Sequence, residues 1–207
     1  SGAKINFLYF PTDCVISLLH VLENGDSSEL AVVGREGVVG VSLFMGGITT
    51  PSRAVVQSAG HALMMEANVL HKQFERGGAL QLLLLRYTQA LITQMAQTAV
   101  CNRHHDVEQQ FARWLLLSFD RLDGDVLRMT QQLIADMLGV RRAGVTEAAR
   151  KLQDAGVIEY TRGRIRILDR PALERAVVEC YFGVRDEYQR LLAALRRHRR
   201  LRWHTRK

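Results

Sequence analysis

The sequence has no long hydrophobic run and few cysteines, and both absences narrow its class. No apolar segment reaches the roughly 18 residues of a membrane span. The start, SGAKINFLYF, lacks the basic region and hydrophobic core of a signal peptide. The three cysteines, Cys14, Cys101 and Cys180, are widely spaced and odd in number, which argues against a disulfide framework. We therefore predict a cytoplasmic protein without membrane contact, with one large or two small domains in 207 residues.

Positive and negative charges are unevenly distributed along the chain. The net charge of +7 comes from residues 196–207, which hold seven Lys or Arg and no acid, because 21 basic and 21 acidic groups balance elsewhere. Residues 126–168 have eight basic and four acidic residues, whereas residues 1–78 have five basic and seven acidic ones. This distribution predicts that one part of the chain binds nucleic acid and that the N-terminal part does not.

The stretch from Thr130 to Ile167 has the pattern of two short helices joined by a tight turn. Thr130 is a good N-cap, and Gly139 breaks the helical spacing where a sharp turn needs a residue that tolerates positive φ. Ala135 is small where the two helices would cross. Apolar residues recur at helical spacing in both helices: Leu133, Ile134, Met137 and Leu138, then Val145, Ala148, Ala149 and Leu152. This combination predicts a helix-turn-helix.

A basic hairpin follows the second helix. Ile165 and Ile167 alternate with Arg164 and Arg166 after a turn at Arg162-Gly163, which predicts a two-stranded wing. The alternative interpretation is a small helical subdomain with a solvated charged face. Helix, turn, helix and basic hairpin in this order favour the DNA-binding interpretation.

The outer face of the second helix carries the residues that we expect to contact DNA. Arg142 is predicted to bind guanine through two hydrogen bonds, and Glu147 to accept one from a cytosine amine. Cations and short polar groups suit phosphates, so we expect positioning contacts from Thr130, Gln131, Arg141, Arg150, Arg162 and Arg164. Thr146 and Lys151 complete the predicted DNA-binding set.

These residues resemble the winged helix-turn-helix of the Crp/Fnr family of bacterial transcription regulators. The resemblance covers nearly the whole chain, strongly in 130–168 and more loosely in 1–76. It implies an α+β fold: an antiparallel β-roll sensor of the double-stranded β-helix type in 1–76, a dimerisation helix in 77–105, and the DNA-binding domain with C-terminal helices in 106–207. It also implies a homodimer on a palindromic operator of double-stranded DNA, with RNA polymerase as a further candidate partner and no enzymatic activity.

The N-terminal segment has the pattern of short strands. Glu23-Asn24-Gly25-Asp26, between two apolar runs, is the strongest hairpin signal in the chain. Further short apolar runs lie at 7–10, 15–19, 30–33 and 54–56, as in a sandwich or roll. A complete roll of this family would have extra strands before Ile5, and the chain starts at Ser1-Gly2, so we expect some of the native N-terminus to be missing.

The family's cyclic-nucleotide cassette is altered in this sequence. The cassette has glycine followed by glutamate, and later arginine, a small hydroxyl residue and alanine; here Val41 follows Gly40, and Arg53 directly precedes Ala54. A missing partner for a buried polar ligand disfavours cAMP. Another effector in the same pocket, or none, remains open. Pocket candidates are Arg35, Glu36, Ser52 and Arg53, for which a surface Arg–Glu pair is the alternative.

Two further features concern the middle of the chain. Leu80, Leu83, Leu84, Tyr87, Leu91, Met95 and Thr98 recur at helical spacing, which predicts a paired helix and, by the resemblance, a parallel dimer seam; a buried intradomain helix is the alternative. Near its end, Cys101, His104 and His105 leave haem open as a weak alternative to structural roles. The family's iron–sulfur branch uses four cysteines and is excluded, and no metal site is predicted.

Two other functional classes are alternatives. Metal-dependent cupin enzymes share the roll but need an H-x-H pair, whereas His20, His61 and His71 are far apart in sequence. The other alternative is a DNA-binding protein whose roll serves only as a dimerisation scaffold.

By the resemblance, the family's recognition helix has arginine, glutamate and arginine in its first half. Only Arg142 matches here, with Ala143 and Glu147 in the other places, so the operator is expected to differ from the best-known half-site.

Overall fold

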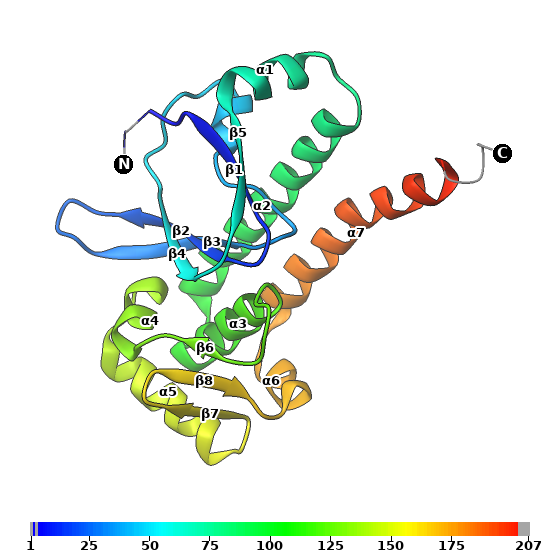
Figure 1. Ribbon diagram of the computed structural model, residues 1–207. Helices are drawn as coiled ribbons and strands as arrows, with labels where there is room; N and C mark the ends of the chain where they lie inside the picture. Colours follow the sequence, from blue (N-terminus) through cyan, green and yellow to red (C-terminus); the bar gives the residue numbers. More distant parts are fainter. Residues whose placement is uncertain (1, 3, 203–207) are drawn as a thin grey trace.

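The structure, a computed structural model, describes the backbone of residues 2 and 4–202 and side chains as far as Leu192. The basic side chains of residues 196–207 therefore lie outside the described part. A long helix, α2, runs between the N-terminal strands and a C-terminal group of helices and short strands (Figure 1). A second long helix, α7, packs along α2 in the opposite direction (Figure 1).

The N-terminal strands are antiparallel, as predicted. Strand β1 pairs with β5, and β2 lies between β3 and β4. The predicted hairpin joins β2 and β3, with Gly25 at φ +92°. The strand bounds are β1 Phe7–Pro11, β2 Val15–Val21, β3 Ser27–Val33, β4 Arg53–Ser58 and β5 Ala62–Glu66, and a 3-10 turn, η1, covers Val41–Phe44. The fold class predicted from the sequence is confirmed.

Helix α1, Ala67–Glu75, was not predicted within the segment assigned to the roll. It follows β5 directly and buries only Leu70 completely. A short helix with one fully buried residue leaves little periodic signal in a sequence, because the helical pattern depends on several apolar residues along one face.

Helix α2, Ala79–His104, has the predicted length, but its predicted seam faces the chain's own interior. Leu84, Tyr87 and Leu91 are each 3% exposed. The Tyr87 ring packs edge-on against Tyr188 of α7, with 6.3 Å between centroids. It also lies against Gly37, where a Cβ atom would be 2.4 Å from the ring. The predicted seam was therefore wrong, because α7 and the strands cover this face.

Another face of α2 is left exposed. It carries Leu82, Leu85, Gln89, Ile92, Ala96 and Ala99, at alternating steps of three and four residues. Leu85 and Ile92 are each 50% exposed. We call these six residues the α2 stripe. Such spacing is that of the a and d positions in a coiled coil.

The C-terminal part begins with α3, Val107–Phe119, whose start is closed by a capping box. The Gln109 backbone N–H donates to Asp106 Oδ1 at 2.9 Å, and the Asp106 N–H donates to Gln109 Oε1 at 3.2 Å. The remaining elements are β6 Leu127–Arg128, α4 Gln131–Leu138, α5 Arg142–Asp154, β7 Ile158–Thr161, β8 Arg164–Ile167, α6 Arg170–Ala176 and α7 Glu179–Arg202. None of the described helices has the length and apolar character for crossing a membrane.

The last two helices, α6 and α7, are separated by a short extended segment. In the structure α6 ends at Ala176, and α7 begins at Glu179. Val177 is the reason, because its extended backbone, at φ −90° and ψ 162°, interrupts the helix.

Candidate nucleic-acid interface

Helices α4 and α5 form the predicted helix-turn-helix. The Leu133 N–H donates to the Thr130 hydroxyl at 3.2 Å, so Thr130 caps α4. Gly139 ends α4 at φ +67°, the left-handed conformation that glycine adopts most easily. Ala135 and Val145 are buried. The short turn therefore packs α5 against α4 and α3 and leaves the opposite face of α5 exposed.

The exposed face of α5 and the start of α4 form one concave surface. A hollow of about 670 Å³ is lined by Gln131, Arg142, Ala143, Thr146, Glu147 and Arg150. The Thr146 hydroxyl lies 2.7 Å from Gln131 Oε1 and links the two helices across it. Five residues of the predicted set thus share one surface, with two guanidinium groups and one carboxylate.

Two other predicted residues on α5 lie off this surface. Lys151 Nζ is 3.2 Å from Glu108 Oε2 and so turns toward α3. Arg141 is the N-cap residue of α5 and lines a different cleft, on the side of the β2–β3 hairpin. Arg150 pairs with Asp154 at 3.1 Å, but both side chains are largely exposed, so this pair holds Arg150 only weakly.

The predicted wing is the β7–β8 hairpin. Arg162 and Gly163 form its turn at φ +52° and +74°, and the Met129 N–H donates to the Gly163 carbonyl at 2.8 Å. The Tyr160 hydroxyl donates to the Met129 carbonyl at 2.8 Å. Burial raises the pKa of Tyr160 to about 12, so this donor stays protonated at neutral pH. The wing is thus fastened to the strand before α4.

Arg128 is a basic residue of this surface that the sequence reasoning missed. Strand β6 pairs with β8 so that Arg128 lies directly opposite Arg164, and both are exposed. Like charges opposite each other destabilise a strand pair, and an anion between them would offset this cost. No sequence pattern pointed to the pair, because a two-residue strand has no periodicity.

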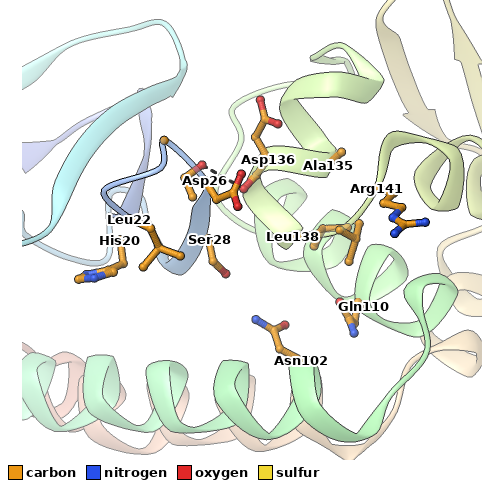
Figure 2. Close-up of a pocket in the computed structure, with 14 residues that line it drawn as sticks. His20, Leu22, Asp26, Ser28, Asn102, Gln110, Ala135, Asp136, Leu138 and Arg141 are labelled. Atoms are coloured by element: carbon orange, nitrogen blue, oxygen red, sulfur yellow. Dashed lines mark hydrogen bonds between the residues drawn. The ribbon is translucent and has the colours of Figure 1, made fainter.

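A cleft of about 700 Å³ separates the β2–β3 hairpin from α4. Figure 2 shows His20, Leu22, Asp26 and Ser28 on the hairpin side, opposite Ala135, Asp136 and Leu138 of α4, with Arg141 beyond them. Asn102 of α2 and Gln110 of α3 complete the lining (Figure 2). The Ser27 hydroxyl donates to the Asp136 carbonyl at 3.2 Å and fastens the hairpin to the helix-turn-helix.

The four predicted effector-pocket residues do not come together. Glu36 accepts a hydrogen bond from Arg121 Nε at 2.6 Å, and Arg35 pairs with Asp123 at 3.2 Å. Arg53 starts β4 opposite Leu19, and Ser52 precedes it. Strand β2 lies between β3, which precedes Arg35, and β4. Arg35 and Glu36 therefore bind side chains just after α3, on the other side of β2 from Ser52 and Arg53.

The geometry is that of a winged helix-turn-helix protein, with a basic, exposed second helix and a basic hairpin beside it. Residues 109–176 match the family model described as the Crp-like helix-turn-helix domain, from within α3 to the end of α6. Over these residues the chain is therefore similar to the Crp-like helix-turn-helix domain. The resemblance to Crp/Fnr regulators predicted from the sequence is confirmed.

Most of the chain has the fold of solved Crp/Fnr regulators. A CRP-family transcriptional regulator from Thermus thermophilus is similar with a TM-score of 0.69 and 19% identity, over 84% of this chain and 89% of that one. FixK2 from Bradyrhizobium japonicum gives a TM-score of 0.74 and 16% identity, over 86% and 90%. The c-di-GMP-responsive global regulator CLP from Xanthomonas campestris gives 0.64 and 16%, over 80% and 86%. None of the curated proteins matches the sequence.

Proposed function

We propose that this protein is a transcription regulator, not an enzyme, that binds double-stranded DNA in the cytoplasm. The observation that carries the proposal is the concave basic face of α5 beside a basic wing, within a Crp-like helix-turn-helix segment. An exposed helix of this kind fits a B-DNA major groove, and the adjoining hairpin is then placed to reach the flanking phosphates.

Within this interface the residues divide into those that read bases and those that position the protein. Arg142, in the first turn of α5, is the candidate for guanine, and Glu147, one turn later, for a cytosine amine. Thr146 lies between them on the same surface. Phosphate contacts are assigned to Thr130, Gln131, Arg141, Arg150, Arg162 and Arg164, and we add Arg128. Lys151 contributes charge from the edge, since it is paired with Glu108.

The active species is proposed to be a homodimer that joins two chains along the α2 stripe. Isolated apolar residues on a surface are ordinary, but six positions that keep a three-four spacing on one helix match a self-complementary seam. Residues 1–76 would then form the sensor, 77–105 the dimerisation segment and 106–207 the DNA-binding domain. Two copies of α5 related by a two-fold axis require a palindromic operator. RNA polymerase is a further proposed partner.

Control by an effector other than cAMP belongs to the same proposal. A second candidate is that the N-terminal part serves only as a dimerisation scaffold. The observation favouring this second candidate is that Arg35 and Glu36 already pair with Asp123 and Arg121 of the same chain. A ligand that used them would have to break both contacts.

The test is selection of operators from random duplex DNA with the full chain. Parallel arms contain no ligand, cyclic mononucleotides, cyclic dinucleotides or haem. We expect a palindrome to be enriched, with half-sites about one helical turn apart or a multiple of it. A palindrome in the ligand-free arm that no ligand alters would favour the scaffold candidate. Binding in every arm that depends on salt but selects no sequence would contradict the proposed regulator.

A further inference from the structure

The end of α2 and the start of α7 bring together residues that are far apart in sequence. Cys180 Sγ lies 4.0 Å from His105 Nδ1, although the two residues are 75 positions apart. A carboxylate oxygen of Glu179 joins them, so that the three donor atoms all lie within 4.8 Å of one another. His105 is the C-cap residue of α2, whereas Glu179 and Cys180 open α7.

We propose that His105, Glu179 and Cys180 form a binding site for a zinc-class divalent transition metal ion. The site is independent of the DNA-binding surface and does not rest on the proposed function. It differs from the sequence prediction, which found only Cys101, His104 and His105 near one another and assigned no metal. The sequence prediction did not include Cys180, because Cys180 comes close to His105 only where α7 packs along α2.

The donor set selects the class of metal. A thiolate, an imidazole nitrogen and a carboxylate oxygen are together the ligands of Zn²⁺ or Co²⁺, whereas Mg²⁺ and Ca²⁺ prefer oxygen donors alone. Three protein ligands leave one position of a tetrahedron open for water or another small ligand. The nearby Cys101 is fully buried.

The sulfur–nitrogen distance requires only a small adjustment, whereas the Glu179 carboxylate oxygen, which lies within 4.8 Å of both atoms, has to approach them. In a tetrahedral zinc site, with a metal–sulfur bond of about 2.3 Å and a metal–nitrogen bond of about 2.0–2.1 Å, the sulfur and nitrogen atoms lie about 3.5 Å apart. The observed 4.0 Å between Cys180 Sγ and His105 Nδ1 is about half an ångström longer. Glu179 is exposed and His105 half-buried, so both side chains can move while Cys180 stays fixed in the interior.

The charge around the thiol sets how the metal competes with the proton. Burial raises the pKa of Cys180, an effect that the nearby Arg113 opposes and Glu179 reinforces. A thiol gives up its proton when it binds a metal ion, as for any cysteine ligand. An occupied site would link the C-terminal end of α2 to the N-terminal end of α7.

The test is titration of the full chain with Co²⁺ near neutral pH, in a phosphine reductant that keeps the thiols free. We expect one equivalent per chain to bind, with the near-ultraviolet charge-transfer band of a thiolate–cobalt bond, and stoichiometric Zn²⁺ to abolish the band. Cys180→Ser should remove the band. His105→Ala should weaken Co²⁺ binding by more than about tenfold, since losing even an outer-shell partner costs that much.

Matched controls are available in the chain. His104→Ala removes an exposed neighbouring histidine, and Cys14→Ser removes a buried thiol in the N-terminal strands. Both variants should bind Co²⁺ as the parent does. If Cys180→Ser fails to fold by circular dichroism, the comparison of His105→Ala with His104→Ala decides. The proposal is overturned if the parent gives no thiolate band, if the band survives in a folded Cys180→Ser variant, or if the two histidine variants bind Co²⁺ equally well.

Discussion

Arg142 and Lys151 are both cations on α5, but their surroundings give them different expected roles. Arg142 lines the exposed hollow, whereas Lys151 pairs with Glu108 of α3. Arg142→Ala is expected to relax the preference at one base position of each half-site, with a loss of about 1–3 kcal/mol in discrimination. The measurement is equilibrium binding to the selected operator and to its single-position variants at fixed salt.

Lys151→Ala is the matched control for Arg142, because it removes a positive charge from the same helix. It should weaken binding to all these duplexes by a similar small factor and leave their order unchanged. If Lys151→Ala alters base preference and Arg142→Ala does not, then α5 is docked on the DNA by a different face from the one proposed.

Glu29 is a buried carboxyl without an ion-pair partner among the described residues. It lies on β3, and neither its Oε2 atom nor the Trp114 indole nitrogen has a hydrogen-bond partner in the described part of the chain. Burial raises the pKa of Glu29 from 4.5 to about 7, although the polar side chains of Ser17 and Trp114, and then the charges of Arg113 and Arg121, oppose the effect. Between these two pH values the folded state holds a proton that the unfolded state releases. The free energy of unfolding should therefore fall as pH rises through this interval.

Glu29→Gln should remove this pH dependence, because glutamine keeps the shape and does not ionise. The change in the free energy of unfolding between pH 4.5 and 7 should differ between parent and variant by an amount on the order of 3 kcal/mol. Urea unfolding across this range measures the difference, which also cancels contributions from other groups. Parallel pH profiles for the two proteins would mean that Glu29 is ionised in the fold.

At the scale of single elements, strand β6 and the wing strand β8 carry an opposed pair of cations. Arg128 of β6 faces Arg164 of β8, and bound phosphate would relieve their repulsion. Arg128→Ala should therefore weaken binding to all duplexes alike and reduce the slope of log affinity against log salt by about 1. Arg175→Ala, at an exposed cation on α6, is the control and should leave the slope unchanged. An unaltered slope for Arg128→Ala would remove Arg128 from the interface.

The composition of the α2 stripe predicts how single substitutions change the stability of the dimer. Gln89 is its one polar member, and a polar residue at a coiled-coil core position lowers stability. Gln89→Leu should therefore tighten the dimer, and Ile92→Glu should dissociate it. Leu63→Glu places the same charge on an apolar residue of β5 that is 67% exposed, outside the stripe, and should leave the dimer intact. Sedimentation over a range of concentrations measures all three, and a monomeric parent protein would contradict the seam.

The helix-turn-helix and α2 show how much of the fold and of the site could be predicted from the sequence. The helix-turn-helix was predictable because its signals are local: Thr130 caps one helix, Gly139 turns the chain, and Val145 packs inward. Helix α2 was predictable for the same reason. The face of α2 that is covered was not predictable, because Tyr188 comes from α7, about 100 positions after Tyr87. The Arg128–Arg164 and His105–Cys180 neighbours depend on the same kind of distant return.

At the scale of the whole molecule, the N-terminal strands and the DNA-binding part share buried polar contacts. Arg121, after α3, donates to Glu36 at 2.6 Å and to Gln94 of α2 at 3.0 Å. Its guanidinium also lies 5.2 Å from the centroid of the Tyr188 ring. A separate hydrogen bond, from Gln57 Nε2 of β4 to the Ser118 hydroxyl of α3 at 2.8 Å, crosses the same junction. Separation of the two parts would break all of these hydrogen bonds.

This junction predicts that the parent chain unfolds in one cooperative transition, with calorimetric and van't Hoff enthalpies that agree. Arg121→Met keeps much of the apolar stem but leaves Glu36 and Gln94 without their donor. The Arg121 side chain is 6% exposed and that of Glu36 25%. We expect a loss of about 3 kcal/mol, the lower end for a broken buried pair, because water can reach Glu36. The calorimetric transition should also split or broaden, since the two parts are then less tightly coupled.

Arg35→Met, which breaks only the exposed pair with Asp123, should shift the midpoint little and keep a single transition. If Arg121→Met unfolds as sharply as Arg35→Met and at the same temperature, the coupling between the two parts resides in their apolar contacts alone.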